Sequence, residues 1–241
     1  MASNQKAVIV TGASQGIGAG VAQSFLDRDY NVVANSRNIT KANPFAASAN
    51  VALVDGDIAD PRTAAKIVDT AVSRFGRIDV LVNNAGIFIP KPFTEYTTEE
   101  FNTLVSTTLA GFLYVSQLAV KQMLRQKSGS IVNVSTTLVD QPIAGVGASV
   151  QIMVKGALNA VTRALAIEYA KEGIRVNTVA LGVINTPMHK PETHDFLKSL
   201  HPVGRIGEIK EVVDAILFLT DATFTTGEIL HIDGGAHAGK W

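Results

Sequence analysis

Seven short apolar runs recur along the chain, and stretches with helical periodicity lie between most of them. The runs occupy residues 7–10, 31–35, 51–54, 78–82, 130–134, 174–179 and 228–232. The first has no polar alternation, which is typical of a strand buried on both faces of a parallel sheet. The helical stretches occupy residues 16–28, 61–75, 98–126, 149–171 and 208–219. Strands and helices alternate to the end of the chain, which predicts a single α/β domain over residues 1–241.

Two local features refine this pattern. Residues 38–50 contain Pro44 and are too few for a full crossover helix, so we expect a clipped or irregular connection there. Asp60 followed by Pro61 is a good N-cap and first-turn pair for the helix predicted at residues 61–75.

Composition and charge exclude several classes of function. The chain has 46% hydrophobic and 17% charged residues, a formal net charge of zero and no basic run, so it lacks the electrostatic footprint of a nucleic-acid-binding protein. It has no cysteine, which excludes disulfides, thiolate catalysis and cysteine-ligated metal, and no metal site is predicted. Residues 1–6 are polar, and no apolar run approaches the ~20 residues that span a bilayer. We expect a soluble cytoplasmic protein without a membrane partner.

Glycines follow the first apolar run at a spacing that suits phosphate binding. Gly12 permits a tight turn, Gly16 and Gly18 leave room for a ligand, and the helix that begins near Gly16 directs unpaired N–H groups toward an anion. The natural occupant is the pyrophosphate of a dinucleotide. The residues between the glycines complete this cradle: Ser14, Gln15 and Ile17. The spacing is G-x-x-x-G-x-G rather than the general G-x-G-x-x-G fingerprint, and a purely structural turn is the alternative.

The end of the second apolar run bears on the choice of cofactor. An acidic residue there would hold the adenosine ribose hydroxyls of NAD, whereas a cation there can hold the 2′-phosphate of NADP. This chain has Ser36 and Arg37 at these positions. NADP(H) is therefore the predicted cofactor in preference to NAD(H), unless Arg37 is only a solvated loop residue.

Three separated motifs resemble those of the classical short-chain dehydrogenase/reductase family over nearly the whole chain. They are Thr11, Gly12, Gly16 and Gly18; Asn83, Asn84, Ala85 and Gly86; and Ile184, Thr186 and Pro187. The resemblance implies a Rossmann-like, doubly wound, seven-stranded parallel sheet with helices on both faces. It also implies an oxidoreductase that transfers hydride between NADP(H) and a small carbonyl or alcohol substrate. Further cofactor contacts implied by the likeness are Asp57, Ile58, Asn84, Ala85, Gly86, Gly182, Ile184 and Thr186.

The family's catalytic set of asparagine, serine, tyrosine and lysine is incomplete in this sequence. The resemblance implies that Thr108, Thr136 and Gln151 stand where the first three would, and that Lys155 is retained. The interval between Thr136 and Gln151 is slightly longer than usual in the family, so Ser149 is an alternative source of the hydroxyl. Leucine also replaces the family's proline before Gly182, at Leu181.

The missing tyrosine raises the question of which group donates the proton. In the family mechanism the phenol gives or takes the proton, and the charge of the lysine lowers the phenol pKa. A glutamine amide has no transferable proton near neutral pH. Candidates are Lys155 itself, a water held by Gln151 and Thr136, or a histidine of segment 188–202, which covers the substrate in this family. These histidines are His189, His194 and His201, and a solvated loop is their alternative interpretation.

Three functional hypotheses follow. The first is a reductase or dehydrogenase with a changed proton donor, the second a sensor or scaffold that binds NADP(H) without turnover, and the third a partner of an active relative in a hetero-oligomer. Segment 188–202 is short and polar, which argues against a large lipid substrate. The family likeness implies a D₂ homotetramer, with a dimer possible, built on apolar residues of the long helices: Phe112, Leu158, Val161 and Leu165.

Overall fold

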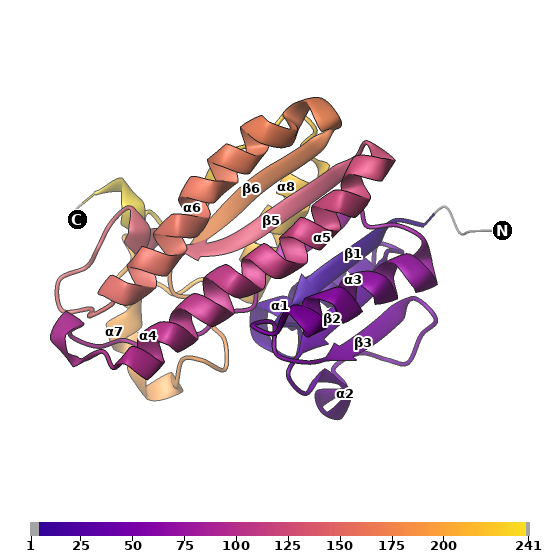
Figure 1. The fold of residues 1–241 in the computed structure, drawn as a ribbon. Coiled ribbons are helices and arrows are strands. Elements are labelled where there is room, and N and C mark those ends of the chain that lie inside the picture. The colour runs from indigo at the N-terminus through magenta and orange to yellow at the C-terminus, as the bar shows by residue number, and fades with distance from the viewer. Residues whose placement is uncertain (1–4, 240–241) are drawn as a thin grey trace.

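The order of the strands creates a topological switch at the centre of the sheet. The structure is a computed structural model that describes residues 5–239, so residues 1–4 of the polar N-terminal segment lie outside it. The strands are β1 (Ala7–Thr11), β2 (Asn31–Ser36), β3 (Val51–Asp55), β4 (Val80–Asn83), β5 (Gly129–Thr136), β6 (Ile174–Leu181) and β7 (Ile229–Ile232). They form one parallel sheet in the order β3-β2-β1-β4-β5-β6-β7 (Figure 1). The strand order reverses between β1 and β4, where open α/β sheets bind ligands beyond the carboxyl ends of their strands.

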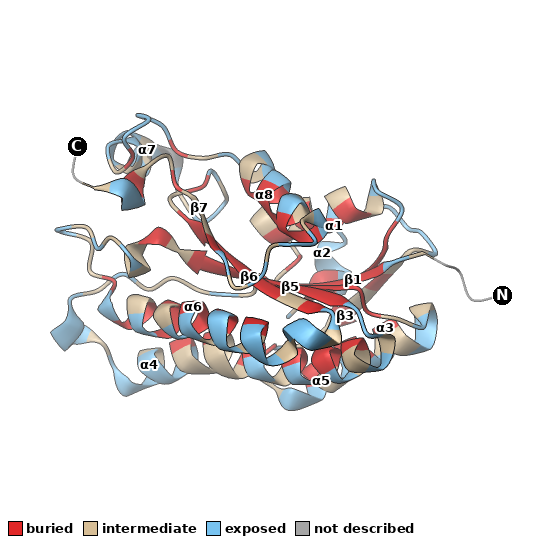
Figure 2. Ribbon diagram, turned by 90° about the horizontal axis from the view of Figure 1, so that it is seen from above, coloured by how far each residue is buried: buried red, intermediate tan, exposed pale blue. Residues whose placement is uncertain are grey.

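Helices cover both faces of the sheet (Figure 2). One face carries α1 (Gly16–Leu26), α2 (Ile39–Ala42) and α8 (Ile209–Asp221); the other carries α3 (Pro61–Phe75), α4 (Thr98–Val105), α5 (Gly111–Gln126) and α6 (Ser149–Tyr169). α7 (His194–Lys198) lies in the segment between β6 and α8. Short 3₁₀ turns lie at Phe93–Glu95, Thr137–Val139, Ala170–Glu172, Pro191–Thr193 and Ala236–Ala238. Separate clusters of buried apolar side chains fill the spaces on the two faces, which confirms the doubly wound α/β architecture.

Local signals in the sequence account for several helix ends. Asp60 caps α3 because its side chain accepts the Arg62 N–H at 2.9 Å, and Gly76 ends that helix with a φ of 76°. Thr97 and Glu100 form a reciprocal capping box at the start of α4. The connection expected to be irregular contains only the single-turn helix α2, so that prediction is confirmed.

The long helix predicted at residues 98–126 is interrupted. α4 ends at Val105, and a π-helical turn, Ser106–Ala110, joins it to α5. A π turn inserts a residue into the helical repeat and shifts the direction of the side chains around it. The prediction of a continuous helix is therefore wrong at this turn, which contains the buried Thr108.

The two longest helical stretches are strongly apolar. Thr98–Gln126 and Ser149–Glu172 are each long and apolar enough to span a membrane by length and composition alone, with 44% of each apolar window buried inside the fold. This overturns the expectation that no stretch approaches that length, and packing of both against the sheet accounts for their apolar composition. Phe112 and Leu158 are buried within the chain, so the prediction that they face another subunit is wrong. The exposed large apolar side chains of α5 and α6 are Leu113, Met153 and Ile167.

Candidate active site

The glycine loop after β1 is fastened to the loop after β4 at the switch point. Asn84 Nδ2 donates to the carbonyl oxygens of Thr11 and Gly12, at 2.9 and 3.2 Å. The Thr11 hydroxyl accepts the backbone N–H groups of Asn84 and Ala85, both at 3.1 Å. These bonds join the two loops directly. The ends of β1 and β4 therefore form one continuous floor.

Three glycines shape this floor for close approach of a ligand. Gly12 and Gly16 have φ values of 67° and 58°, a region that favours glycine. A Cβ atom on Gly18 would lie 2.3 Å from the Gly12 carbonyl oxygen. Gln15 precedes α1 without a side-chain cap, so no cap bonds the N–H groups of the first turn. An uncapped helix N-terminus beside such a turn fits the pyrophosphate of a dinucleotide, because both the free N–H groups and the helix dipole favour an anion.

One cavity of about 950 Å³ connects this loop with the first turn of α6. It lies beyond the carboxyl ends of β1, β4, β5 and β6, as expected for a switch-point site. Its walls include many of the sequence-predicted cofactor residues: Gly12, Gln15, Gly16, Ile17, Gly18, Asn84, Ala85, Gly86, Gly182 and Thr186. They also include three predicted catalytic residues: Thr136, Gln151 and Lys155.

Other predicted cofactor residues lie outside these walls. Arg37 and Asp57 are exposed in the loops after β2 and β3, and Ser36 ends β2. Ile184 is buried, pairs with Gly207 in an isolated bridge and is not a wall residue, although Val183 and Thr186 on either side of it are. The remaining two are the partly buried Ser14 and the buried Ile58, which lines a smaller cavity.

Gln151 and Lys155 lie one helical turn apart at the start of α6, and both are buried. Gln151 is 3% exposed, and its Oε1 has no hydrogen-bond partner. The Lys155 ammonium donates to the Val134 carbonyl oxygen at 2.7 Å. Burial disfavours that charge and lowers the pKa of Lys155 to about 8. The cavity therefore contains an amide without a partner and a lysine that can exchange a proton near neutral pH.

The hydroxyls at the end of β5 differ in their availability. Ser135 Oγ donates to the Lys155 carbonyl oxygen at 3.4 Å, and Thr137 Oγ1 donates to Asp233 at 2.6 Å. Thr136 Oγ1 makes only long bonds, to the Leu181 carbonyl oxygen and from the Leu138 N–H, both at 3.3 Å. Thr136 is therefore the hydroxyl best placed to turn toward a ligand. Ser149 is exposed and lies outside the cavity walls, so the alternative that it supplies the hydroxyl is wrong.

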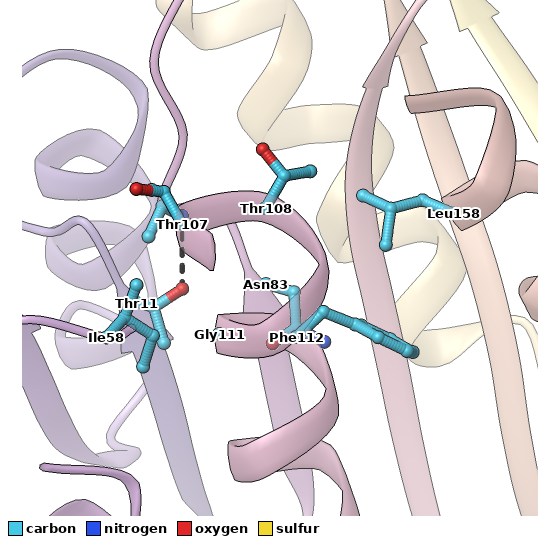
Figure 3. A pocket seen from close by; sticks show the side chains of 9 residues that line it. Thr11, Ile58, Asn83, Thr107, Thr108, Gly111, Phe112 and Leu158 are labelled. Carbon is cyan, nitrogen blue, oxygen red and sulfur yellow. Dashed lines mark hydrogen bonds between the residues drawn. The ribbon is translucent and has the colours of Figure 1, made fainter. Parts of the chain in front are cut away.

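Thr108 does not reach the large cavity. It is 3% exposed, its Oγ1 has no hydrogen-bond partner, and it lines a separate cavity of about 10 Å³ (Figure 3). Thr11, Asn83 and Leu158 contribute to the same small cavity. A space of this size suits one water molecule and no organic ligand. The structure therefore corrects the prediction that Thr108 acts on the substrate directly.

Of the three histidines, His201 is excluded as a proton donor. It is 4% exposed; its Nδ1 bonds to the Leu197 carbonyl oxygen at 3.0 Å, and its Nε2 accepts the Val183 N–H at 2.9 Å. Both ring nitrogens are engaged, and burial lowers the pKa of His201, so the ring is a neutral anchor of segment 188–202, called the lid below. His189 lines the cavity, and burial also lowers its pKa, whereas His194 lies outside the walls.

Sequence reasoning missed the apolar lining of the part of the cavity that is walled by segment 188–202 and the loops after β4 and β5, here called the substrate half. The lid supplies Met188, Phe196, Leu197 and Leu200, although its composition suggested a polar cover. The loops after β4 and β5 supply Ile87, Phe88, Pro90, Pro92, Leu138, Ile143 and Val146. These two loops are joined by the Lys91 N–H, which donates to the Gly147 carbonyl oxygen at 2.8 Å. In the sequence, the glycine at position 147 is the feature that could have indicated this contact between the loops. Any other residue there would place a Cβ atom 2.4 Å from the Lys91 carbonyl oxygen.

Comparison with known proteins agrees with this geometry. A family model described as "Enoyl-(Acyl carrier protein) reductase" matches residues 12–237. The chain is 35% identical to "Glucose 1-dehydrogenase" of Gluconobacter oxydans (strain 621H), over 95% of this chain and 91% of that protein. It is 37% identical to "Granaticin polyketide synthase putative ketoacyl reductase 2" of Streptomyces violaceoruber, over 95% of each chain.

The solved structures extend the likeness to the whole fold. One of them is ElxO with NADP bound, and another is a tyrosine-to-phenylalanine variant of ElxO with NADPH bound. Each matches this chain with a TM-score of 0.90 and 33% identity, over 98% of this chain and 100% of that chain. The chain belongs to the short-chain dehydrogenase/reductase family. As a member of that family it is an oxidoreductase by fold and by relationship, and the cavity between the glycine loop and α6 is its candidate active site.

Proposed function

We propose that this chain is an NADP(H)-dependent oxidoreductase that interconverts a carbonyl compound and its alcohol, with an altered active site in which Gln151 stands in place of the family's proton-donating tyrosine. The observation that carries the proposal is the single cavity of about 950 Å³, which joins a dinucleotide-type glycine loop to Thr136, Gln151 and Lys155. The binding of NADP by ElxO supports the choice of a nicotinamide cofactor. The exposed Arg37 after β2 supports NADP over NAD, because its guanidinium is free to bind a 2′-phosphate.

A bound nicotinamide cofactor supplies or accepts the hydride in this chemistry. The residues of the chain must bind the substrate oxygen and move the proton. Thr136 can donate a hydrogen bond to that oxygen, and Gln151 can do the same without transferring a proton. Lys155, with a pKa of about 8, is mostly protonated at neutral pH and has a proton to give. We assign the proton transfer to Lys155, directly or through one water.

A cofactor-binding protein without turnover is the second candidate, and one observation favours it. The Lys155 ammonium is bonded to the Val134 carbonyl oxygen, so it must leave or share that bond to protonate a substrate. A misplaced acid reduces catalysis by about 10²- to 10⁴-fold. NADPH would then bind while the carbonyl chemistry proceeds slowly or not at all, as in a sensor or in the inactive partner of an active relative.

Calorimetric titration with NADPH and absorbance assays of NADPH oxidation with a panel of ketones and aldehydes test the proposed function together. We expect NADPH binding and slow turnover on the panel. Binding without turnover on any carbonyl or alcohol would favour the second candidate. Failure to bind either NADPH or NADH would overturn both.

We also propose a homotetramer that functions in the cytoplasm without nucleic acid or a membrane. The support is the set of exposed apolar side chains on α5 and α6, including Leu113, Met153 and Ile167, which an adjacent copy would cover. Light scattering at micromolar concentration should give about four times the 25.5 kDa mass of the chain. A particle of 25.5 kDa would contradict this assembly.

A further inference from the structure

The substrate half of the cavity is lined by apolar side chains that keep accessible surface. Met188 and Phe196 of the lid both line the cavity, and each is 60% exposed. Further apolar side chains on the loops after β4 and β5 line it and are only partly buried: Phe88, Leu138, Ile143 and Val146. Large apolar side chains that gather around one cavity without burying each other mark a place where a ligand covers them.

Hydrogen bonds hold these walls in place before any ligand arrives. His201 Nε2 accepts the Val183 N–H at 2.9 Å, which ties the lid to the end of β6. The Lys91 N–H donates to the Gly147 carbonyl oxygen at 2.8 Å, which joins the loops after β4 and β5. A ligand therefore meets walls that are already assembled, and little ordering of the chain opposes its binding.

Polar side chains are few in the substrate half, and none of them offers a buried, free hydrogen-bonding group. Among the described wall residues at 87–92, 138–147 and 188–200, the polar ones are Lys91, His189, Lys190 and Thr193. The Lys91 ammonium donates to Glu100 at 2.5 Å, and Thr193 Oγ1 donates to the Lys190 carbonyl oxygen at 2.7 Å. Lys190 is exposed, and burial lowers the pKa of His189, so its ring is neutral at pH 7.

These walls do not suit a ligand with many hydroxyl groups. Each hydroxyl loses its bonds to water on entering, and an apolar wall provides no replacement. A charged ligand is disfavoured as well, because Glu100 already balances the Lys91 charge and solvent screens Lys190. A ligand with an apolar body loses few bonds to water and covers Met188 and Phe196.

We propose that the substrate is an uncharged carbonyl compound with a mainly apolar body, which binds between the lid and the loops after β4 and β5. Polyhydroxylated carbonyl compounds such as sugars are excluded. The inference rests on the proposed function, because it takes the cavity of about 950 Å³ as the active site. It assigns Phe196 of α7 a contact with the apolar body of the substrate.

Calorimetry with three ketones that share one cyclohexanone ring tests the substrate class. They are 4-phenylcyclohexanone, 4-oxocyclohexanecarboxylate and pentahydroxycyclohexanone, and they are titrated into wild type loaded with NADP⁺, which cannot reduce them. We expect the phenyl ketone to bind at least about 100-fold more tightly than the pentahydroxy ketone and about tenfold more tightly than the carboxylate. Equal affinities, tighter binding of either polar ketone, or binding of none would overturn the proposal.

Two phenylalanines of similar exposure provide a matched pair of variants. Phe196→Ser removes a wall residue, and we expect it to weaken binding of 4-phenylcyclohexanone about tenfold without changing NADP⁺ affinity. Phe93→Ser is the control, because Phe93 is 65% exposed and is not a wall residue, so affinity should stay within about twofold. If the two variants bind the phenyl ketone equally well, the contact assigned to Phe196 is wrong.

The loading step separates this inference from the proposed function. Failure of wild type to bind NADP⁺ and NADPH refutes the NADP(H)-dependent oxidoreductase, and the preference among the three ketones is then measured in the cofactor-free protein. Binding of NADP⁺ with equal affinity for the three ketones refutes only the apolar substrate class.

Discussion

The two halves of the cavity are shaped by different groups: the half at the glycine loop by backbone atoms, and the half at α6 by side chains. At the glycine loop, backbone carbonyl and N–H groups, Asn84 and the absence of Cβ atoms at Gly12 and Gly18 define the shape. At α6, individual side chains define the shape of the wall, and Gln151 and Lys155 are its polar groups. A side chain in the first half would collide with backbone, so the sequence there is tightly constrained. In the second half the wall is made of individual side chains, so a change of residue there changes the chemistry of the cavity directly.

Removal of Lys155 should produce the largest effect, and it should be confined to the α6 half. We expect Lys155→Met to lower carbonyl reduction by about 10²- to 10⁴-fold, the range for loss of a positioned acid. The structure supplies no other group of the α6 turn with a proton to give near neutral pH. Steady-state kinetics with NADPH measure this, and Lys171→Met, at an exposed lysine, is the control. Unchanged turnover in Lys155→Met would assign the proton to another group.

The pH dependence of stability reports on the same lysine without any assay of activity. The folded chain releases the Lys155 proton near pH 8, whereas the unfolded chain holds it up to its ordinary pKa of 10.5. Unfolding therefore takes up a proton between these values, and the free energy of unfolding should rise as pH increases from 8 to 10.5. The contribution is about 3 kcal/mol at 1.36 kcal/mol per pH unit. Urea unfolding at several pH values should show this slope in wild type, and its persistence in Lys155→Met would contradict the assignment.

A methyl group at Gly18 should damage the glycine-loop half. Its Cβ would lie 2.3 Å from the Gly12 carbonyl oxygen and 2.6 Å from Asn84 Nδ2, so the floor must move. We expect Gly18→Ala to lower the free energy of unfolding by about 1 to 3 kcal/mol and to weaken NADPH about 100-fold. Thermal unfolding and calorimetry measure the two effects.

Gly156→Ala is the matched control for this glycine. It lies in the interior of α6, where a Cβ would make an ordinary contact of 3.6 Å with Val139. This substitution should stabilise the chain by up to about 1 kcal/mol, because alanine is the better helix former. If both alanines behave alike, close approach is not what constrains Gly18.

A smaller effect is expected at the rim of the cofactor half. Charge-assisted hydrogen bonds from Arg37 to a 2′-phosphate contribute about 1.5 to 3 kcal/mol. NADPH should therefore bind about 10- to 100-fold more tightly than NADH. Arg37→Ala should remove the difference and leave NADH unchanged, while Lys41→Ala, at an exposed lysine of α2, should retain it. Equal affinities for the two cofactors in wild type would place Arg37 outside the site.

The contrast between the halves also explains what sequence could predict. The role of the glycine loop in shaping the cavity could be predicted from Gly12, Gly16 and Gly18. Close approach of backbone atoms and positive φ values permit few other residues at these positions. The positions of Gln151 and Lys155 on one buried face follow from helical spacing. The π turn at Thr108 packs against α6, and no feature of the local sequence marks it, so it could not be predicted.

Segment 188–202 shows the same limit. Its composition is polar, yet folding turns Leu197 and Leu200 inward and buries His201 against the Val183 N–H. The bond from the Val183 N–H, just after β6, to His201 joins residues 18 positions apart, and composition does not record such a contact. Arg37 is exposed in the loop after β2, so its predicted role of binding the 2′-phosphate of NADP is a matter for the titration with both cofactors.

The most direct test of the whole account is single-turnover reduction of a simple ketone by NADPH-saturated wild type and Gln151→Tyr. Lys155 lies one helical turn after this position, and both residues line the cavity. We expect slow reduction by wild type, at least about tenfold faster reduction by Gln151→Tyr, and similar NADPH affinity in both. Rapid reduction by wild type that is lost in Gln151→Tyr and unaffected in Lys155→Met would contradict it.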